Sequence, residues 1–284
     1  MTDTWFHETL HTEWQAGMRM DHLIYRGQTE FQSVLIFDNA LLGRVLVLDG
    51  VVQTTTGDEF IYHEMLAHVP LLALENPGEV LIIGGGDGGC LEEVLKHPVD
   101  RVTMIELDSE VVDLAQEYLG MICGQAFIDP RTELRIEDGA KFLAETNRRF
   151  DLIIIDSTDP VGPGAVLFSP EFYGNCSRCL TPSGILVTQN GVPFIQGDEL
   201  EATAQAFKDL FQYPRFYFTH VPTYMGGAMA LGCASNRTDA GAVSLADLTA
   251  RQIGRDLTLQ YYSPAVHQAA FAVPPYVRAI IGLG

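Results

Sequence analysis

The chain has 284 residues, 47% of them hydrophobic, and 17 basic against 37 acidic residues give it a formal net charge of −20. A nucleic-acid-binding protein normally presents a basic face, so this balance argues against a nucleic-acid partner and favours small cations, which an acidic protein attracts. No apolar run reaches the roughly 18 residues of a membrane-spanning helix, and the start has no secretory pattern, so we expect a globular cytoplasmic protein with no membrane partner.

Short β-like runs fill the first part of the chain, at residues 21–27, 31–39 and 44–55. Glycines and Asp-Asn pairs separate them, which predicts a small antiparallel sheet. Residues 58–74 then have helical spacing, with Asp58 placed as a possible N-cap. We place the boundary after residue 66, between an N-terminal β-strand domain (1–66) and a Rossmann-like catalytic domain (67–284).

From about residue 79, apolar strands alternate with amphipathic helices. The predicted strands are 79–85, 101–108, 133–138, 150–157 and 184–190, and the predicted helices between them are 88–97, 109–119, 139–146 and 169–180. Continuous apolar strands of this kind predict a parallel sheet with helices on both faces. The loop 157–168 is long for a strand-to-helix connection, and we expect it to act as a lid over the site.

Cysteine and histidine spacings do not predict a metal site. Five cysteines, an odd number, argue for free thiols in a reducing compartment. Cys176 and Cys179 have the CxxC spacing, but no second pair accompanies them, and we interpret them as ordinary helical cysteines. The stretch HEMLAH at 63–68 resembles HExxH, but its second histidine comes one residue too late for both side chains to share a helix face.

Carboxylates follow four successive predicted strands. They are Asp87, Glu106, Asp138 and Asp156, with Asp159 shortly after the last. In open α/β sheets the ligand lies at the carboxyl ends of the strands. A single acid there means little, because turns and helix caps favour aspartate, but four in order predict a shared site.

The glycine loop VLIIGGGDGGC, residues 80–90, carries the next signal. It matches GxGxxG, and Glu106 lies 20 residues beyond Gly86, as in dinucleotide-binding proteins. An NAD-dependent oxidoreductase is therefore one alternative. Asp87 argues against it, because this loop suits anions. A carboxylate there would repel pyrophosphate by roughly 4 kcal/mol per charge pair at about 4 Å and an effective dielectric of about 20.

If Asp87 does more than cap the following helix, the ligand should be a nucleoside with a cationic tail, such as an adenosyl sulfonium compound. Glu106 can hold both ribose hydroxyls, Asp138 can accept a hydrogen bond from the adenine amino group, and Asp87 can hold the ammonium of the tail. This reasoning predicts a class I methyltransferase-like fold and leaves the transferred group open. A small-molecule N-methyltransferase and a non-enzymatic sensing or scaffold protein that uses the same acidic cleft remain alternatives.

Several stretches resemble the spermidine synthases, the polyamine aminopropyltransferases. They are LDGVVQTT, DEFIYHEMLAHVPL, LIIGGGDGG, IELD, DSTDPVGP, VPTYMGG and YYSPAVHQAAF. The resemblance implies decarboxylated S-adenosylmethionine as co-substrate with no further cofactor, putrescine as the usual acceptor, and a homodimer or homotetramer. The acceptor stays open among putrescine, cadaverine, agmatine and spermidine, because a pocket distinguishes only about 1–3 kcal/mol per methylene.

The same resemblance implies roles for individual residues. Asp156 matches the catalytic base. The residues implied for donor binding are Gln32, Asp87, Glu106, Asp138, Gly139 and Pro163, and those implied for acceptor binding are Tyr62, His63, Asp159 and Tyr224. For His63 two interpretations stay open: a hydrogen bond to the attacking nitrogen, or simple packing.

Overall fold

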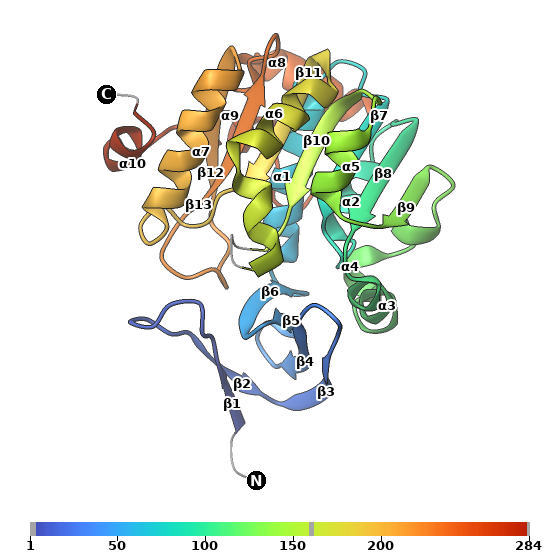
Figure 1. The fold of residues 1–284 in the computed structure, drawn as a ribbon, viewed down its shortest axis with the longest axis vertical. Helices are drawn as coiled ribbons and strands as arrows, with labels where there is room; N and C mark the ends of the chain where they lie inside the picture. The colour runs from blue at the N-terminus through green and yellow to red at the C-terminus, as the bar shows by residue number, and fades with distance from the viewer. Residues whose placement is uncertain (1–3, 159–161, 283–284) are drawn as a thin grey trace.

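The computed structural model has two parts, a large helix-covered sheet and a smaller set of N-terminal strands beneath it (Figure 1). The structure describes residues 4–158 and 162–282. The N-terminal strands are β1 (Thr4–His7), β2 (Gly17–Met20), β3 (His22–Gln28), β4 (Ser33–Asn39), β5 (Gly43–Leu48) and β6 (Val51–Thr55).

The remaining elements build the large sheet and its helices. They are α1 (Glu59–Ala73), β7 (Glu79–Gly84), α2 (Gly89–Leu95), β8 (Arg101–Glu106), α3 (Ser109–Tyr118), α4 (Gly120–Cys123), η1 (Ala126–Ile128), β9 (Thr132–Ile136), α5 (Gly139–Glu145), β10 (Phe150–Asp156), η2 (Gly162–Phe168), α6 (Pro170–Cys179), β11 (Leu180–Gln189), α7 (Gly197–Leu210), β12 (Tyr213–Thr219), β13 (Met229–Ser235), η3 (Ala240–Ala242), α8 (Leu245–Gly254), α9 (Pro264–Ala270) and α10 (Pro275–Ile280). Cys176 and Cys179 are buried free thiols of α6. Among the described residues, no helix is long and apolar enough to cross a bilayer.

The N-terminal strands form a four-stranded antiparallel sheet, β3-β4-β5-β6, and a separate β1-β2 pair. The sheet confirms the predicted antiparallel strands, whereas the sequence did not predict β1 and β2. The predicted run 44–55 folds back on itself, because Asp49 and Gly50 have φ angles of +48° and +79° and form a tight hairpin turn. One face of this sheet, which includes Val34 and Ile36, packs on α3 and α4 of the larger part.

The large sheet has seven strands in the order β12-β13-β11-β10-β7-β8-β9. The five strands predicted from the sequence, β7 to β11, all run parallel, as expected. Strand β13 runs antiparallel to β11 and β12, so the complete sheet is mixed. The sequence did not predict β12 and β13, which extend the sheet beyond β11.

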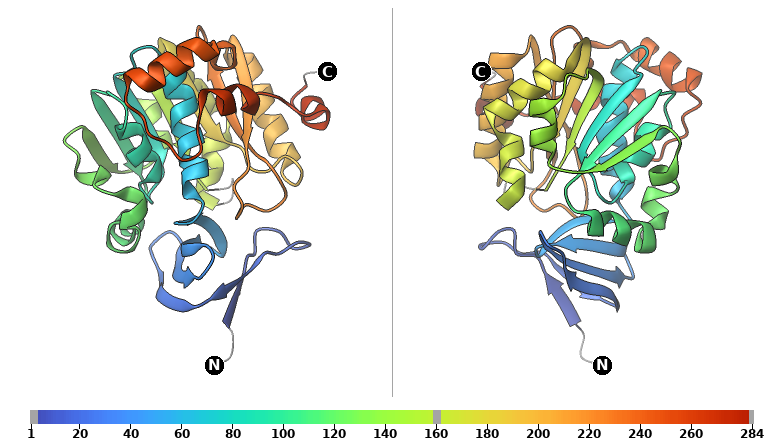
Figure 2. Two further views of the ribbon diagram at one scale, coloured as in Figure 1. Left: turned by 180° about the vertical axis from the view of Figure 1, so that it is seen from behind. Right: turned by 45° about the vertical axis from the view of Figure 1, so that its right-hand side comes forward.

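Alternating side chains of β7 divide the core into two layers. Val80 and Ile82 belong to the cluster that includes α1, α2 and α8, whereas Leu81 and Ile83 belong to the cluster that includes α5, α6 and α7. Helices therefore cover both faces of the sheet, as predicted (Figure 2). A strand buried on both faces needs an unbroken apolar run, and this is the pattern that β7 shows.

Helix α1 connects the two parts and brings its first turns to the site. Its residues from Tyr62 to Ala73 are all buried. Asp58 occupies the N-cap position but does not cap the helix. Instead its carboxylate accepts hydrogen bonds from the Thr55 hydroxyl (2.7 Å) and the Thr223 amide (2.9 Å). The predicted domain boundary after residue 66 falls within α1, and the division into 1–66 and 67–284 remains a prediction.

Candidate active site

A cavity of about 510 Å³ lies where the carboxyl ends of the parallel strands face the N-terminal part. The chain runs from β7 outward through β8 and β9 and then returns to the other side of β7 as β10. Such a switch in strand order opens a crevice for a ligand. The residues of the predicted site that line this cavity are Gln32, Tyr62, Asp87, Glu106, Asp138, Gly139, Asp156 and Tyr224.

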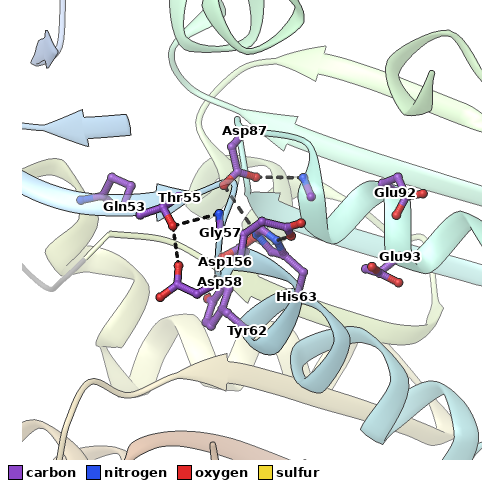
Figure 3. A network of polar contacts seen from close by, with 12 residues as sticks. Gln53, Thr55, Gly57, Asp58, Tyr62, His63, Asp87, Glu92, Glu93 and Asp156 are labelled. Carbon is purple, nitrogen blue, oxygen red and sulfur yellow. Dashed lines mark hydrogen bonds and ion pairs between the residues drawn. The ribbon is translucent and has the colours of Figure 1, made fainter. Parts of the chain in front are cut away.

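The other three residues of the predicted site are placed differently. The His63 side chain is only 2% exposed and pairs with Asp87 (Figure 3), and it is not among the residues that line the cavity. Asp159 lies outside the described residues. Pro163 falls within η2, and Gly164, Val166 and Leu167 of the same segment contribute to the cavity wall.

The glycine loop contacts the end of β10 through its backbone. The amide of Gly85 donates to the carbonyl oxygen of Asp156 at 2.8 Å. Gly84 and Gly85 have φ angles of +83° and +73°, which side-chain-bearing residues rarely adopt. A Cβ atom at Gly84 would lie 2.1 Å from the carbonyl oxygen of Asp156, so the loop can approach β10 only with glycine there.

Asp87 lines the cavity and also contacts the first residue of helix α2. Its Oδ1 accepts a hydrogen bond from the Gly89 amide at the start of α2 (2.9 Å). Its Oδ2 lies 3.5 Å from Nε2 of His63. The two interpretations of Asp87, a local helix contact and a ligand contact, are therefore compatible.

Glu106 ends β8 with its carboxylate fixed to the backbone. Oε1 accepts hydrogen bonds from the amides of Leu107 (2.7 Å) and Asp108 (3.0 Å). Burial raises the pKa of Glu106 to about 7, although these two bonds oppose the shift. A Cβ atom at Gly86 would lie 3.0 Å from Oε2 of Glu106, so glycine at this position makes room for the carboxylate beside the loop.

The raised pKa of Glu106 predicts pH-dependent binding of a ribose-containing ligand. Only the ionised carboxylate can accept hydrogen bonds from both ribose hydroxyls, so affinity should fall as pH decreases through about 7. The fall is expected to be at most about tenfold per pH unit, measured by calorimetry with the adenosyl donor. Glu106→Gln should bind more weakly and lose this slope, and an unchanged slope in the variant would contradict the assignment.

Asp138 and Gly139 form the start of α5. Oδ1 of Asp138 accepts from the amides of Ala140 (2.8 Å) and Lys141 (3.1 Å) and so caps the helix. A Cβ atom at Gly139 would lie 2.5 Å from a methyl carbon of Ile83, which explains the small residue. The cap holds the Asp138 carboxyl group at the cavity edge.

Asp156 is the last residue of β10 and lines the cavity. Its Oδ1 accepts a hydrogen bond from the Tyr62 hydroxyl at 2.7 Å. Burial raises the pKa of Asp156 to about 6, and the neighbouring Asp87 reinforces this, while His63 and Tyr62 oppose it. Burial and the charge of Asp156 raise the pKa of Tyr62, so this phenol remains a donor. A carboxylate with such a pKa suits proton transfer near neutral pH.

Several polar residues that line the cavity were missed by the sequence analysis, and Gln53, Asp108 and Gln189 are bonded within it. The carbonyl of Gln53 accepts from the Tyr224 hydroxyl (2.6 Å), and Asp108 accepts from the side-chain amide of Gln32 (3.0 Å). The side-chain amide of Gln189 donates to the carbonyls of residues 157 and 158, each at 3.2 Å. Gln189 ends β11, so the rule that identified the acids at strand ends would have found it had amides been included.

The charge of the cavity wall is strongly one-sided. Its acidic members are Glu8, Asp49, Asp87, Glu106, Asp108, Glu137, Asp138 and Asp156. Among the described residues, no lysine or arginine lines it. Carboxylates gathered in a low-dielectric cleft attract cations and repel phosphates, so the site suits a cationic ligand and not a pyrophosphate.

Family models match both parts of the chain. A model described as the spermine/spermidine synthase domain matches residues 59–242. A second, described as the spermidine synthase tetramerisation domain, matches residues 4–56. The chain belongs to the spermine/spermidine synthase family. It is therefore a transferase of the polyamine aminopropyltransferase class, and the resemblance found in its sequence motifs is confirmed.

Relatives of known name cover nearly the whole chain. A polyamine aminopropyltransferase of Ruegeria sp. (strain TM1040) is 53% identical over 279 residues, 98% of each chain. Polyamine aminopropyltransferase 1 of Pseudomonas aeruginosa is 49% identical over 98% of this chain and 97% of its own. The second family model supports an oligomeric assembly.

Solved structures confirm the expected fold. A spermidine synthase in complex with the transition-state analogue AdoDATO superposes with a TM-score of 0.94 at 38% identity, covering 100% of this chain and 97% of its own. The spermidine synthase of Thermotoga maritima superposes with a TM-score of 0.91 at 36% identity, covering 100% and 96%. The Rossmann-like sheet with a small N-terminal antiparallel part is thus the architecture of this family.

Proposed function

We propose that this enzyme transfers the aminopropyl group of decarboxylated S-adenosylmethionine to putrescine, forming spermidine and methylthioadenosine. The observation that carries the proposal is Asp87, a carboxylate in a glycine loop at the wall of a cavity without lysine or arginine among its described residues. Such a loop suits a donor whose tail ends in an ammonium and has lost its carboxylate. The similarity to a structure that holds AdoDATO supports the same ligand class.

The donor would lie along the glycine loop from β9 to β7. In this arrangement Asp138 and Gly139 take the adenine, Glu106 takes the ribose hydroxyls, and Asp87 takes the ammonium of the tail. Gln32, held by Asp108, would contact the same tail from the N-terminal part. Pro163 of η2 would cover the donor, as the family resemblance implies.

The reaction would be a direct displacement. A nitrogen of the acceptor attacks the aminopropyl carbon bound to sulfur, the carbon–sulfur bond breaks with its electron pair going to sulfur, and methylthioadenosine leaves. The sulfonium is already a good leaving group, so most of the catalysis is alignment of nitrogen, carbon and sulfur. The acceptor amine, with a pKa of about 10, must first lose a proton.

Asp156 would take that proton. Its raised pKa, about 6, narrows the gap to the ammonium, and the adjacent sulfonium would lower the pKa of the acceptor amine further. Tyr62 donates to Oδ1 of Asp156 and so orients the carboxylate. Tyr62, Tyr224 and Asp159 would hold the carbon chain and the far amine of putrescine.

Asp87→Asn is expected to weaken binding of the decarboxylated donor by roughly tenfold to a hundredfold, because a hydrogen bond to a charged group contributes about 1.5–3 kcal/mol. Ordinary S-adenosylmethionine, which keeps its carboxylate, should lose less affinity. Calorimetry with both compounds measures the difference, and Asp113→Asn, an exposed acid of α3, serves as the control. Equal losses for both compounds would argue against repulsion between Asp87 and the carboxylate of S-adenosylmethionine, and an unchanged affinity for the decarboxylated donor would argue against an ammonium contact.

A mass-spectrometric end-point assay tests the function itself. The purified protein receives decarboxylated S-adenosylmethionine and a mixture of putrescine, cadaverine, agmatine and spermidine. Methylthioadenosine with spermidine as the preferred product supports the proposal. Another preferred product would show that a different amine is the acceptor. Absence of methylthioadenosine with every amine would refute aminopropyl transfer.

We further propose that the enzyme works in the cytoplasm as a homodimer or homotetramer. All five cysteines are buried free thiols, as expected in a reducing compartment. The match of residues 4–56 to a tetramerisation domain supports self-association through the N-terminal strands. The net charge of −20 fits small cationic substrates rather than nucleic acid.

A further inference from the structure

A buried chain of charged groups lies behind the cavity wall at the start of α1. Glu59 is the first residue of α1, and His63 follows it by four positions, which places both on one face of the helix. Nδ1 of His63 is 2.7 Å from Oε2 of Glu59, and Nε2 of His63 is 3.5 Å from Oδ2 of Asp87. The histidine therefore lies between two carboxylates, only one of which faces the cavity.

The ring of His63 is held in this orientation by packing. Its side chain is 2% exposed. A Cβ atom at Gly89 would lie 2.3 Å from the ring, so the glycine backbone lies directly against it. The ring of Tyr62 packs edge-on at 5.3 Å between centroids. The packing leaves the ring little freedom to turn toward the cavity.

The geometry also favours one protonation state of His63. A neutral imidazole has one N–H, whereas an imidazolium has two. Two carboxylates, one at each ring nitrogen, are both satisfied only by the imidazolium. Burial lowers the pKa of His63, but Asp87 and Glu59 outweigh it and raise the pKa well above its ordinary value.

We infer that Glu59 is a positioning residue, which holds His63 as a cation against Asp87 so that Asp87 presents a fixed carboxylate to the cationic substrate. Oδ1 of Asp87 is bound to the Gly89 amide and Oδ2 faces His63, so both oxygens have a defined place. Glu59, His63 and Asp87 together carry one negative charge. This role rests on the proposed function, since it assumes that Asp87 meets a cationic substrate.

The three residues Glu59, His63 and Asp87, called the relay below, also act on Asp156, the proposed general base. Asp87 raises the pKa of Asp156, and His63 lowers it. Loss of the cation at His63 would therefore raise the pKa of Asp156 further, and less of the base would be ionised near neutral pH. The charged and titratable groups around His63 are Glu59 and Tyr62 of α1, Asp87 of the glycine loop, Asp156 of β10, and Glu92 of α2, which is bound to Lys96.

The relay assigns His63 a place in the site that neither sequence interpretation anticipated. With a carboxylate at each ring nitrogen, the imidazolium has no lone pair to accept a hydrogen bond from an attacking amine. His63 does more than pack, because its charge faces the carboxylate of Asp87 and lowers the pKa of Asp156. Glu59 then explains why this cation is stable in a buried position.

The test compares Glu59→Gln with Glu75→Gln, which removes an exposed carboxylate just beyond the end of the same helix. In Glu59→Gln we expect kcat/KM to fall about tenfold, as for loss of one charge-assisted hydrogen bond. The acid limb of its kcat/KM–pH profile should move to higher pH, because the pKa of Asp156 rises. Glu75→Gln should match the unsubstituted enzyme, and adding Glu59→Gln to His63→Gln should cause little further loss.

An NMR titration of the unsubstituted protein tests the relay without any change in the site. The His63 imidazole, identified by comparison with His63→Gln, should stay protonated well above the ordinary midpoint of 6.5. A His63 midpoint near 6.5, or an acid limb in Glu59→Gln that coincides with that of Glu75→Gln, would overturn the positioning role and leave the proposed function intact. Absence of methylthioadenosine from the unsubstituted enzyme would instead overturn the proposed function, and with it the catalytic meaning of the relay.

Discussion

Asp156→Asn is expected to lower kcat by about a hundredfold to ten-thousandfold, the range for loss of a general base. Asparagine keeps the shape of the side chain and the backbone carbonyl that receives the Gly85 amide. It cannot take a proton from the acceptor ammonium. The donor does not depend on that proton transfer, so its Kd should change by less than about tenfold. Single-turnover kinetics and calorimetry measure the two quantities separately.

The pH profile gives a second measure of the same role. With an Asp156 pKa of about 6, activity of the unsubstituted enzyme should fall below that pH as the base becomes protonated. Residual activity of Asp156→Asn should lack this limb. Tyr62→Phe is the matched control, because it removes only the phenol bonded to the same carboxylate. The loss of this hydrogen bond to a charged group should cost about 1.5–3 kcal/mol. Equal losses of turnover and donor affinity in Asp156→Asn would contradict the base assignment.

Among substitutions that add one methyl group to the site, Gly84→Ala is expected to cause the largest loss of stability and of donor binding. The residue has a φ of +83°, and a Cβ atom there would lie 2.1 Å from the carbonyl oxygen of Asp156. Backbone strain costs about 1–3 kcal/mol, and overpacking typically adds about 1–3 kcal/mol. The loop and β10 must separate, which displaces Asp156 and opens the donor site.

Thermal unfolding measures the loss of stability in Gly84→Ala, and calorimetry with the donor measures the loss of binding. The two costs add to a destabilisation of about 2–6 kcal/mol, which corresponds to a fall in Tm of roughly 4–24 °C for a domain of this size class. Gly174→Ala in α6 is the control, because a Cβ atom there meets nothing within 4 Å and alanine favours a helix. An unchanged Tm with full donor binding in Gly84→Ala would show that the contact between Gly84 and Asp156 is not needed.

Local patterns were sufficient for the central part of the fold. Strands buried on both faces require unbroken apolar runs, and helices covering them require a period near 3.6, so β7 to β11 and helices α2, α3, α5 and α6 could be predicted. The sequence also predicted that the acids at the strand ends share one site, because parallel strands present their carboxyl ends at one edge of the sheet. The cavity is lined by all four of them, Asp87, Glu106, Asp138 and Asp156.

Pairing between distant segments was beyond local patterns. The short runs of β1 and β2 carry only four residues each and become strands through their partners. Strand β13 inserts between β11 and β12, and no local pattern specifies that neighbour. Asp58 sits where a helix cap is expected, yet its carboxylate turns to Thr223, 165 residues away.

The sequence alone therefore determined the class of fold, the glycine loop and the acids of the site, because each depends on residue type and spacing within one or two elements. Only the tertiary structure decided where the side chain of His63 lies. The direction of its ring depends on how α1 packs against the glycine loop, and this packing places the ring between Glu59 and Asp87. Two adjacent carboxylates favour the cationic form of a buried histidine, and only the folded chain brings these three residues together.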